Sequence, residues 1–315
     1  MPGYIGVEVG KGDNAKAGWT AEQYSRRQIR WMAQETHGGA TQVTTTDASA
    51  RDLAASTEPI LVSDRDGVRT VILNRPAAYN SFNTDLKVAL LAALSAAAAQ
   101  ESVRAVVITG AGRAFCAGQD LKEHLALVTT GDERLATTVS QFYNPLVFAI
   151  TGMTKPVIAA VNGAAAGAGA GLAFACDLRI AARSASFSMA FAGVALSADT
   201  GASYLLPRLI GYGRASRMML LGDKVDAAEG LQIGMVDILV DDGELAEAAQ
   251  RLAASLAAGP ALALSKIKAS LQYAASADLQ DALAFEDQAQ TACFASPDHL
   301  EAIQAFVEKR PPRYV

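Results

Sequence analysis

The chain has 315 residues, which is enough to bury a core of about 250 residues and to leave further segments outside it. Hydrophobic residues make up 51% of the chain and aromatic residues only 6%, and this surplus of small and aliphatic side chains favours a mixed α/β fold over an all-β sandwich. The 27 basic and 32 acidic residues give a formal net charge of -5, so no general positive field is available to attract RNA or DNA.

The cysteines and the apolar runs exclude several further classes of protein. Cys116, Cys176 and Cys293 are far apart and lack a CxxC spacing, which indicates neither a disulfide framework nor a metal site. Apolar runs such as residues 163–175 are shorter than the ~18 residues that a membrane span needs, and the first residues lack the pattern of a secretory signal. We therefore expect a soluble, cytoplasmic protein with no metal, membrane or nucleic-acid partner.

Three regions are expected along the chain. Residues 1–56 are predicted to be an N-terminal extension, partly helical or disordered, with one helix-like stretch at residues 20–34 and no assigned function. Residues 57–255 are predicted to form the core. Residues 256–315 are predicted to form a C-terminal helical region, because helix-period segments follow one another and strand signals almost vanish after about residue 200.

The core begins with short β-branched runs that are typical of strands. The first two runs follow Pro59, and further runs lie at residues 104–110 and 156–163. Between two of them, Asn83 to Ala99 has an Asn cap and a long Ala/Leu face, which predicts a helix. This alternation predicts repeated crossover units of strand and helix.

Two turns of small residues follow predicted strands, Phe115 to Leu121 and Asn162 to Gly171. Each could leave peptide N–H groups free to point at an anionic oxygen, and two such donors on one carbonyl stabilise the negative charge that develops there. The alternative is that these small residues only permit tight packing of helix on sheet. The second turn does not match the G-x-G-x-x-G pattern of a dinucleotide site, and the chain has no P-loop.

Four motifs, in their order and spacing, resemble the crotonase (enoyl-CoA hydratase/isomerase) superfamily over about residues 58 to 313. They are Leu73-Asn74-Arg75-Pro76, Asn80-Ser81-Phe82-Asn83, Phe115 to Leu121 and Asn162 to Asp177. The resemblance implies an α/β fold of the ClpP/crotonase type, a spiral of ββα units with a C-terminal helical trimerisation region. It also implies a homotrimer or dimer of trimers, an acyl-CoA thioester substrate, and no cofactor beyond the coenzyme A that the substrate carries.

By the same resemblance, the main-chain N–H groups of Gln119 and Ala168 occupy the two oxyanion-hole positions. Ala168 replaces a commoner glycine, and an alanine keeps the donor provided that its φ is not positive. The residues that the resemblance implies for substrate binding are Ala117, Gln119, Asp120, Leu121, Lys122 and Gly167.

Hydration in this superfamily uses two glutamates, whose positions hold Gly171 and Phe191 in this chain. Asp199 is the carboxylate that we expect to lie close to these positions. The residues around it resemble those of the 1,2-epoxyphenylacetyl-CoA isomerases and enoyl-CoA isomerases, one branch of the superfamily. We therefore expect Asp199 to be catalytic and isomerisation to be favoured. The alternative for Asp199 is a cap of the helix that starts near Thr200.

Other readings remain open at this point. One is an enoyl-CoA hydratase that uses another carboxylate, such as Glu123, and a non-enzymatic one is a crotonase-fold RNA-binding protein. His124 is a secondary site candidate, and Lys122 and Arg208 could contact CoA phosphates or form salt bridges. Cys116 is expected to serve packing and not covalent catalysis. The acyl group stays open.

Overall fold

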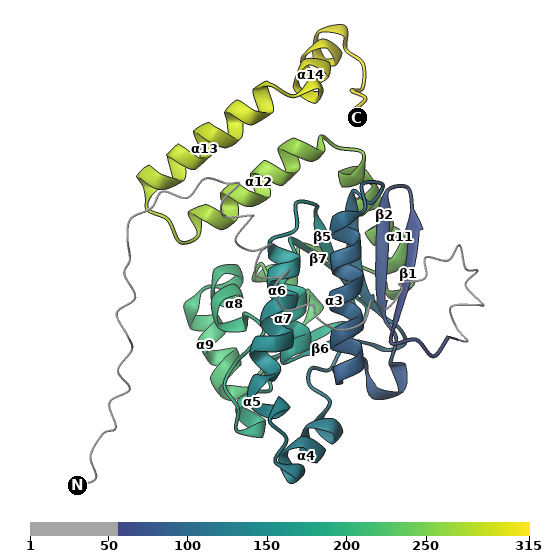
Figure 1. Cartoon of the computed structure of the whole chain (residues 1–315), viewed down its shortest axis with the longest axis vertical. Coiled ribbons are helices and arrows are strands. Elements are labelled where there is room, and N and C mark those ends of the chain that lie inside the picture. The colour runs from purple at the N-terminus through teal and green to yellow at the C-terminus, as the bar shows by residue number, and fades with distance from the viewer. Residues whose placement is uncertain (1–55) are drawn as a thin grey trace.

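The computed structural model describes residues 56–315 (Figure 1). The expected extension at residues 1–56, with its helix-like stretch, therefore lies outside the described residues except for Ser56.

The main sheet has six strands in the order β1-β2-β3-β5-β7-β10, and only β1 and β2 run antiparallel to each other. A two-residue turn of Asp66 and Gly67, both with positive φ, joins this first pair, as a tight hairpin requires. The strands are β1 Ile60–Arg65, β2 Val68–Leu73, β3 Ala105–Gly110, β5 Val157–Val161, β7 Leu178–Ala182 and β10 Ile238–Val240.

A second sheet of four short strands has the order β4-β6-β8-β9. Its strands are β4 Ala114–Cys116, β6 Ala164–Ala166, β8 Ser186–Ser188 and β9 Lys224–Asp226. Three times in succession a strand of the main sheet leads directly into a strand of the second sheet: β3 into β4, β5 into β6, and β7 into β8. This repetition is a spiral of ββα units, and it confirms the predicted crotonase-type α/β fold.

Helices cover both faces of the main sheet, which explains why its strands are almost continuously apolar. α3 packs with alternate strand residues such as Val106 and Ile108 on one face, and α11 packs with Ala105 and Val107 on the other. The helices up to this point are α3 Thr84–Ala99, α4 Leu121–Thr130, α5 Arg134–Thr138, α6 Asn144–Thr151, α7 Ala168–Ala175, α8 Ala202–Ile210, α9 Tyr212–Leu221, α10 Ala227–Gln232 and α11 Leu245–Ala257.

Shorter helical turns complete the core. A single π-helical segment, η2 at Val139–Tyr143, joins α5 to α6. The 3-10 turns are η1 Pro76–Ala78, η3 Ala192–Val194 and η4 Asp242–Glu244.

Three helices follow the core: α12 Ala261–Ala274, α13 Leu279–Phe294 and α14 Pro297–Glu308. Figure 1 shows α13 and α14 reaching beyond the body that the two sheets and their covering helices form. They expose large apolar side chains, with Phe306 84% and Leu279 74% exposed. No helix among residues 56–315 has the length and the apolar character needed to cross a membrane.

The predicted helix at residues 83–99 is confirmed, and Asn83 caps it by accepting a hydrogen bond from the N–H of Leu86. The sequence did not reveal the five-residue strand β7 or the strands of three residues, of which β4 is the first. β6, β8, β9 and β10 have three residues each, too few to show the alternation that identifies a strand.

Candidate active site

The first predicted turn is held against the Asn80-Ser81-Phe82-Asn83 motif. The N–H of Phe82 donates to the Gly118 carbonyl at 2.7 Å, and the N–H of Asp120 donates to the Phe82 carbonyl at 3.0 Å. Because Gly118 and Asp120 both face Phe82, the main-chain groups of Gln119 between them point the other way. Among residues 56–315 the N–H of Gln119 has no acceptor.

The second predicted turn ends at the N-terminus of α7. Gly167 has φ 51 and ψ -122, a conformation that favours glycine, and its N–H donates to the Ser188 carbonyl at 2.9 Å. Ala168 is the first residue of α7, where an N–H has no partner within the helix. Its φ is not positive, so the alanine fits without strain and leaves the N–H available.

The two turns meet because β4 pairs with β6, with Cys116 opposite Ala165. Gly118 has φ 86, and a Cβ on it would lie 2.8 Å from the Ala166 carbonyl oxygen and 3.4 Å from the Ala168 nitrogen; a Cβ on Gly169 would lie 2.1 Å from the Cys116 carbonyl oxygen. Both positions therefore require glycine. The structure brings the N–H groups of Gln119 and Ala168 to neighbouring positions, as an oxyanion hole requires.

Asp199 lies in a constrained segment before α8. Thr200, which is 1% exposed and has φ 50, donates its hydroxyl to the Asp199 carboxylate at 2.7 Å. Burial raises the pKa of Asp199 above its ordinary value, although the Thr200 hydrogen bond and the charge of Lys87 oppose the rise. A buried carboxylate with a raised pKa is suited to accept a proton and give it back.

The capping alternative for Asp199 is wrong. α8 begins at Ala202 with Gly201 as its N-cap residue, and no side chain caps this helix. The Asp199 carbonyl, not its carboxylate, accepts the N–H of Ala202. The carboxylate is therefore free of helix donors.

Neither of the two positions where hydratases are expected to carry glutamate holds a carboxylate, and Gly171 is closed to one. A Cβ on Gly171 would lie 2.9 Å from both the Cβ and the carbonyl oxygen of Thr200, so any side chain there displaces Thr200. Phe191 is 9% exposed, and its ring lies 3.8 Å from the place of a Cβ on Gly167. It gives the second position an apolar surface beside the turn of Gly167.

Glu123, the other carboxylate considered for hydration, is engaged in structure. Both of its oxygens accept the N–H of Thr84 at 3.1 Å, so the side chain caps the start of α3. Asp120 caps α4 and accepts a hydrogen bond from Arg75 at 2.9 Å. Although burial opposes it, these bonds hold the pKa of Asp120 below its ordinary value.

The remaining predicted residues differ in what they contact. The side chains of Ala117, Leu121 and Lys122 are exposed around the first turn. Arg208 stacks on Tyr204 of its own helix, with 3.4 Å between the guanidinium carbon and the ring centroid. Burial raises the pKa of the Cys116 thiol to about 12, which agrees with a packing role.

Two site residues, Lys87 and Tyr143, were missed by the sequence reasoning. The side-chain oxygen of Gln119 accepts from Lys87 Nζ at 3.4 Å and from the Tyr143 hydroxyl. Tyr143 ends the π-helical segment, a type of distortion that is frequent at functional sites. Lys87 is a single lysine on the buried, otherwise apolar face of α3. A charged residue in that position of the helical pattern was the feature from which the sequence could have indicated a site residue.

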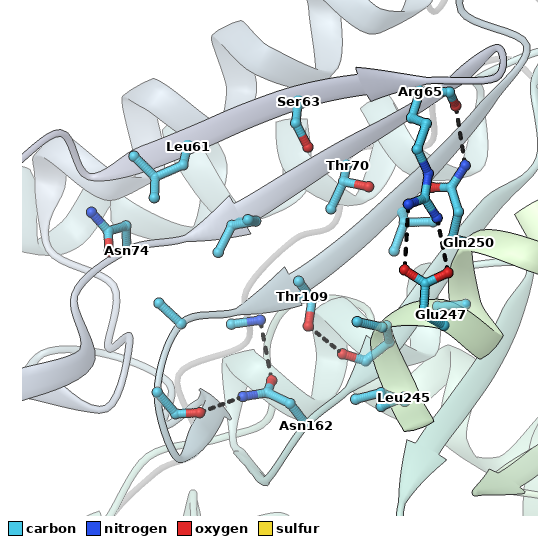
Figure 2. A pocket seen from close by; sticks show the side chains of 18 of the residues that line it. Leu61, Ser63, Arg65, Thr70, Asn74, Thr109, Asn162, Leu245, Glu247 and Gln250 are labelled. Atoms are coloured by element: carbon cyan, nitrogen blue, oxygen red, sulfur yellow. Dashed lines mark hydrogen bonds and ion pairs between the residues drawn. The ribbon is translucent and has the colours of Figure 1, made fainter. Parts of the chain in front are cut away.

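A groove of about 910 Å³ lies elsewhere, on the main-sheet face that carries α11 (Figure 2). None of the predicted catalytic or substrate-binding residues lines it. Figure 2 shows Arg65 paired with Glu247, and Gln250 donating to the main chain of Arg65. The other charged side chains of the groove are engaged as well, Asp64 with Arg69 and Asp242 with the N–H of Ser184, which makes the groove a poor candidate for the reaction.

The two-sheet spiral is the fold of the crotonase class of acyl-CoA proteins. The family model for enoyl-CoA hydratase/isomerase matches residues 63–315. The chain is 42% identical over 257 residues to the 1,2-epoxyphenylacetyl-CoA isomerase of Escherichia coli, covering 82% of this chain and 98% of the relative. It is 32% identical over 252 residues to the short-chain-enoyl-CoA hydratase of Clostridium acetobutylicum, covering 79% and 95%.

A solved structure agrees with these matches. An enoyl-CoA hydratase from Polaromonas superposes with a TM-score of 0.78 at 34% identity, covering 81% of this chain and 99% of the other. The chain therefore belongs to the enoyl-CoA hydratase/isomerase family and is an enzyme of acyl-CoA thioesters.

Proposed function

We propose that the protein isomerises enoyl-CoA thioesters or a related ring thioester of the 1,2-epoxyphenylacetyl-CoA kind. In this proposal the N–H groups of Gln119 and Ala168 hold the thioester oxygen, and Asp199 moves the proton. The observation that carries it is the half-buried Asp199 carboxylate with its raised pKa, held by Thr200, which leaves no room for a side chain at Gly171.

The reaction needs one base and no water. Asp199 takes a proton from one carbon of the acyl chain, and the electron pair moves toward the thioester oxygen to give a dienolate. The two N–H groups stabilise this oxygen, each by on the order of 3 kcal/mol. The same carboxyl then returns the proton to a different carbon, so the double bond moves and the atoms balance.

The residues around the first turn complete the proposed site. Leu121 and Lys122 stand exposed beside Gln119, where they would border the thioester and pantetheine together with Ala117 and Gly167. Coenzyme A then arrives with the substrate, and no separate cofactor is invoked. The exposed apolar faces of α12 to α14 favour assembly into a homotrimer or a dimer of trimers.

Hydration is the second candidate, because relatives of both names match the chain. The engagement of Glu123 with the N–H of Thr84 and the contact of Gly171 with Thr200 both weigh against it. A parent protein that hydrates crotonyl-CoA faster than it isomerises a 3-enoyl-CoA would reverse this order.

The test of the base is Asp199→Asn, which keeps the oxygen that accepts from Thr200. We expect a loss of about 10²–10⁴-fold in kcat for conversion of a 3-enoyl-CoA to the 2-enoyl form. Asp287→Asn, the same change at an exposed position of α13, is the matched control and should leave kcat unchanged. Equal rates in parent and Asp199→Asn would remove Asp199 from the mechanism.

A further inference from the structure

Lys87 is an unusual residue for the interior of a helix. It lies on the buried face of α3 and is 1% exposed, among neighbours such as Leu86 and Leu90. A buried ammonium costs several kcal/mol unless other groups compensate its charge. A fold that keeps such a charge next to its candidate active site is expected to use it.

The ammonium of Lys87 contacts the first turn of the site. Its Nζ donates to the side-chain oxygen of Gln119 at 3.4 Å, and it lies 5.0 Å from the ring centroid of Phe142 and 5.4 Å from that of Tyr143. The Tyr143 hydroxyl donates to the same Gln119 oxygen. Tyr143 also packs edge-on against Phe82, the residue that pairs with Gln119.

Ionisable groups from four other elements surround this contact. They are Glu123 of α4, Asp199 before α8, Tyr143 of η2 and, facing Tyr143, Cys116 of β4. Burial lowers the pKa of Lys87, while the negative charges of Glu123 and Asp199 act in the opposite direction. Burial raises the pKa of Tyr143, and Asp199 adds to that rise, so the carboxylate is close to both residues.

The two carboxylates near Lys87 are not equivalent. Glu123 is held by the N–H of Thr84 through both oxygens. Asp199 has one hydrogen bond, from Thr200, and burial works against its charge. The Thr200 hydrogen bond and, after it, the positive charge of Lys87 both favour the charged form of this carboxylate.

We propose that Lys87 is a positioning residue of the site, which holds the side chain of Gln119 in place and supplies the buried positive charge nearby before substrate binds. This inference rests on the isomerase function proposed above. A protonated carboxyl cannot accept the proton of the substrate, so the charge of Lys87 determines the pH range in which Asp199 is a base.

The test compares the pH dependence of kcat in three variants. Lys87→Met removes the charge and keeps an unbranched apolar stem, and Lys87→Gln removes the charge but keeps a donor for Gln119. In both, the acidic limb of the profile is expected to move to higher pH by about one unit, because an opposite charge has been taken from Asp199. Lys155→Met is the matched control.

Lys155 contacts the far end of the same helix, donating to the Ala97 and Gln100 carbonyls at 2.6 Å. Its loss should lower the melting temperature and leave the acidic limb where it is. A purely structural role for Lys87 would give the same pattern as Lys155→Met. Unmoved limbs in both Lys87 variants would overturn the proposal.

An infrared titration of the resting enzyme makes the result independent of turnover. The carboxyl band of Asp199 is identified by its absence in Asp199→Asn, and its midpoint should be higher in Lys87→Gln than in the parent. If Asp199→Asn were fully active, the proposed base would be wrong, but this titration would still decide the effect of Lys87. Identical midpoints in parent and Lys87→Gln would refute it.

Discussion

Gly171 of α7 is a position at which a single added methyl group would act on the proposed base through Thr200. A Cβ there would lie 2.9 Å from the Cβ and the carbonyl oxygen of Thr200. Ordinary contacts between such atoms start at about 3.5 Å, so Thr200 must retreat by about half an ångström. Because the Thr200 hydroxyl donates to Asp199 at 2.7 Å, the proposed base moves as well.

The free energies for Gly171→Ala oppose each other. Replacing glycine by alanine inside a helix stabilises by about 0.8–1 kcal/mol, whereas overpacking a core costs about 1–3 kcal/mol. We therefore expect a net loss of up to about 2 kcal/mol in the free energy of unfolding. Displacement of Asp199 should reduce kcat by about tenfold, since a shift of 1 Å can cost about a hundredfold.

The measurements are denaturant unfolding and isomerase turnover, with Gly213→Ala as the matched control. Gly213 is exposed in α9, and a Cβ there would have no atom within 4 Å. This control should keep full activity and gain up to about 1 kcal/mol. A Gly171→Ala protein as stable as the control, with parental kcat, would show that Thr200 does not couple the two positions.

Two further outcomes follow from the burial of ionisable groups. The pKa of Asp199 is raised above its ordinary value of 3.8 in the folded protein, so the protein loses stability as pH rises from 3.8 through the pKa of the folded state. Asp199→Asn removes this loss. The variant should therefore melt at a higher temperature than the parent at neutral pH and at the same temperature at lower pH. Equal melting temperatures at neutral pH would contradict this. Burial raises the pKa of the Cys116 and Cys176 thiols to about 12. At mildly alkaline pH a disulfide reagent should therefore modify only Cys293 in the folded chain, and all three thiols after denaturation. Rapid native reaction of a second thiol would count against the packing around Cys116 or Cys176.

The sequence predicted the repeating strands and the helix at Asn83 to Ala99 because their signals are local. β-branched runs, an Asn cap and an apolar helical face each depend on neighbouring residues. The short strands β8 and β9 gave no such signal, since three residues cannot establish a period. They form because β6 pairs with β8, and β8 with β9.

The candidate site was predicted where glycines mark the main chain and was missed where side chains meet across the fold. Gly118 and Gly167 have positive φ, so the turns that present Gln119 and Ala168 could be found from residue types alone. Lys87 could not be assigned in this way. It is separated from Gln119 by 32 positions, and only the packing of α3 on the turn brings them together.

The sequence by itself therefore predicted the class of fold and the two turns of small residues, and its family resemblance supplied Gln119, Ala168 and Asp199 as candidate site residues. Only the tertiary structure decided what surrounds that carboxylate. Thr200 fills the space beside Gly171, Glu123 is used by the N–H of Thr84, and Lys87 supplies the buried charge. The physical reason is that a turn is fixed by local backbone conformation, whereas the charge of a buried group depends on atoms that are distant in the chain.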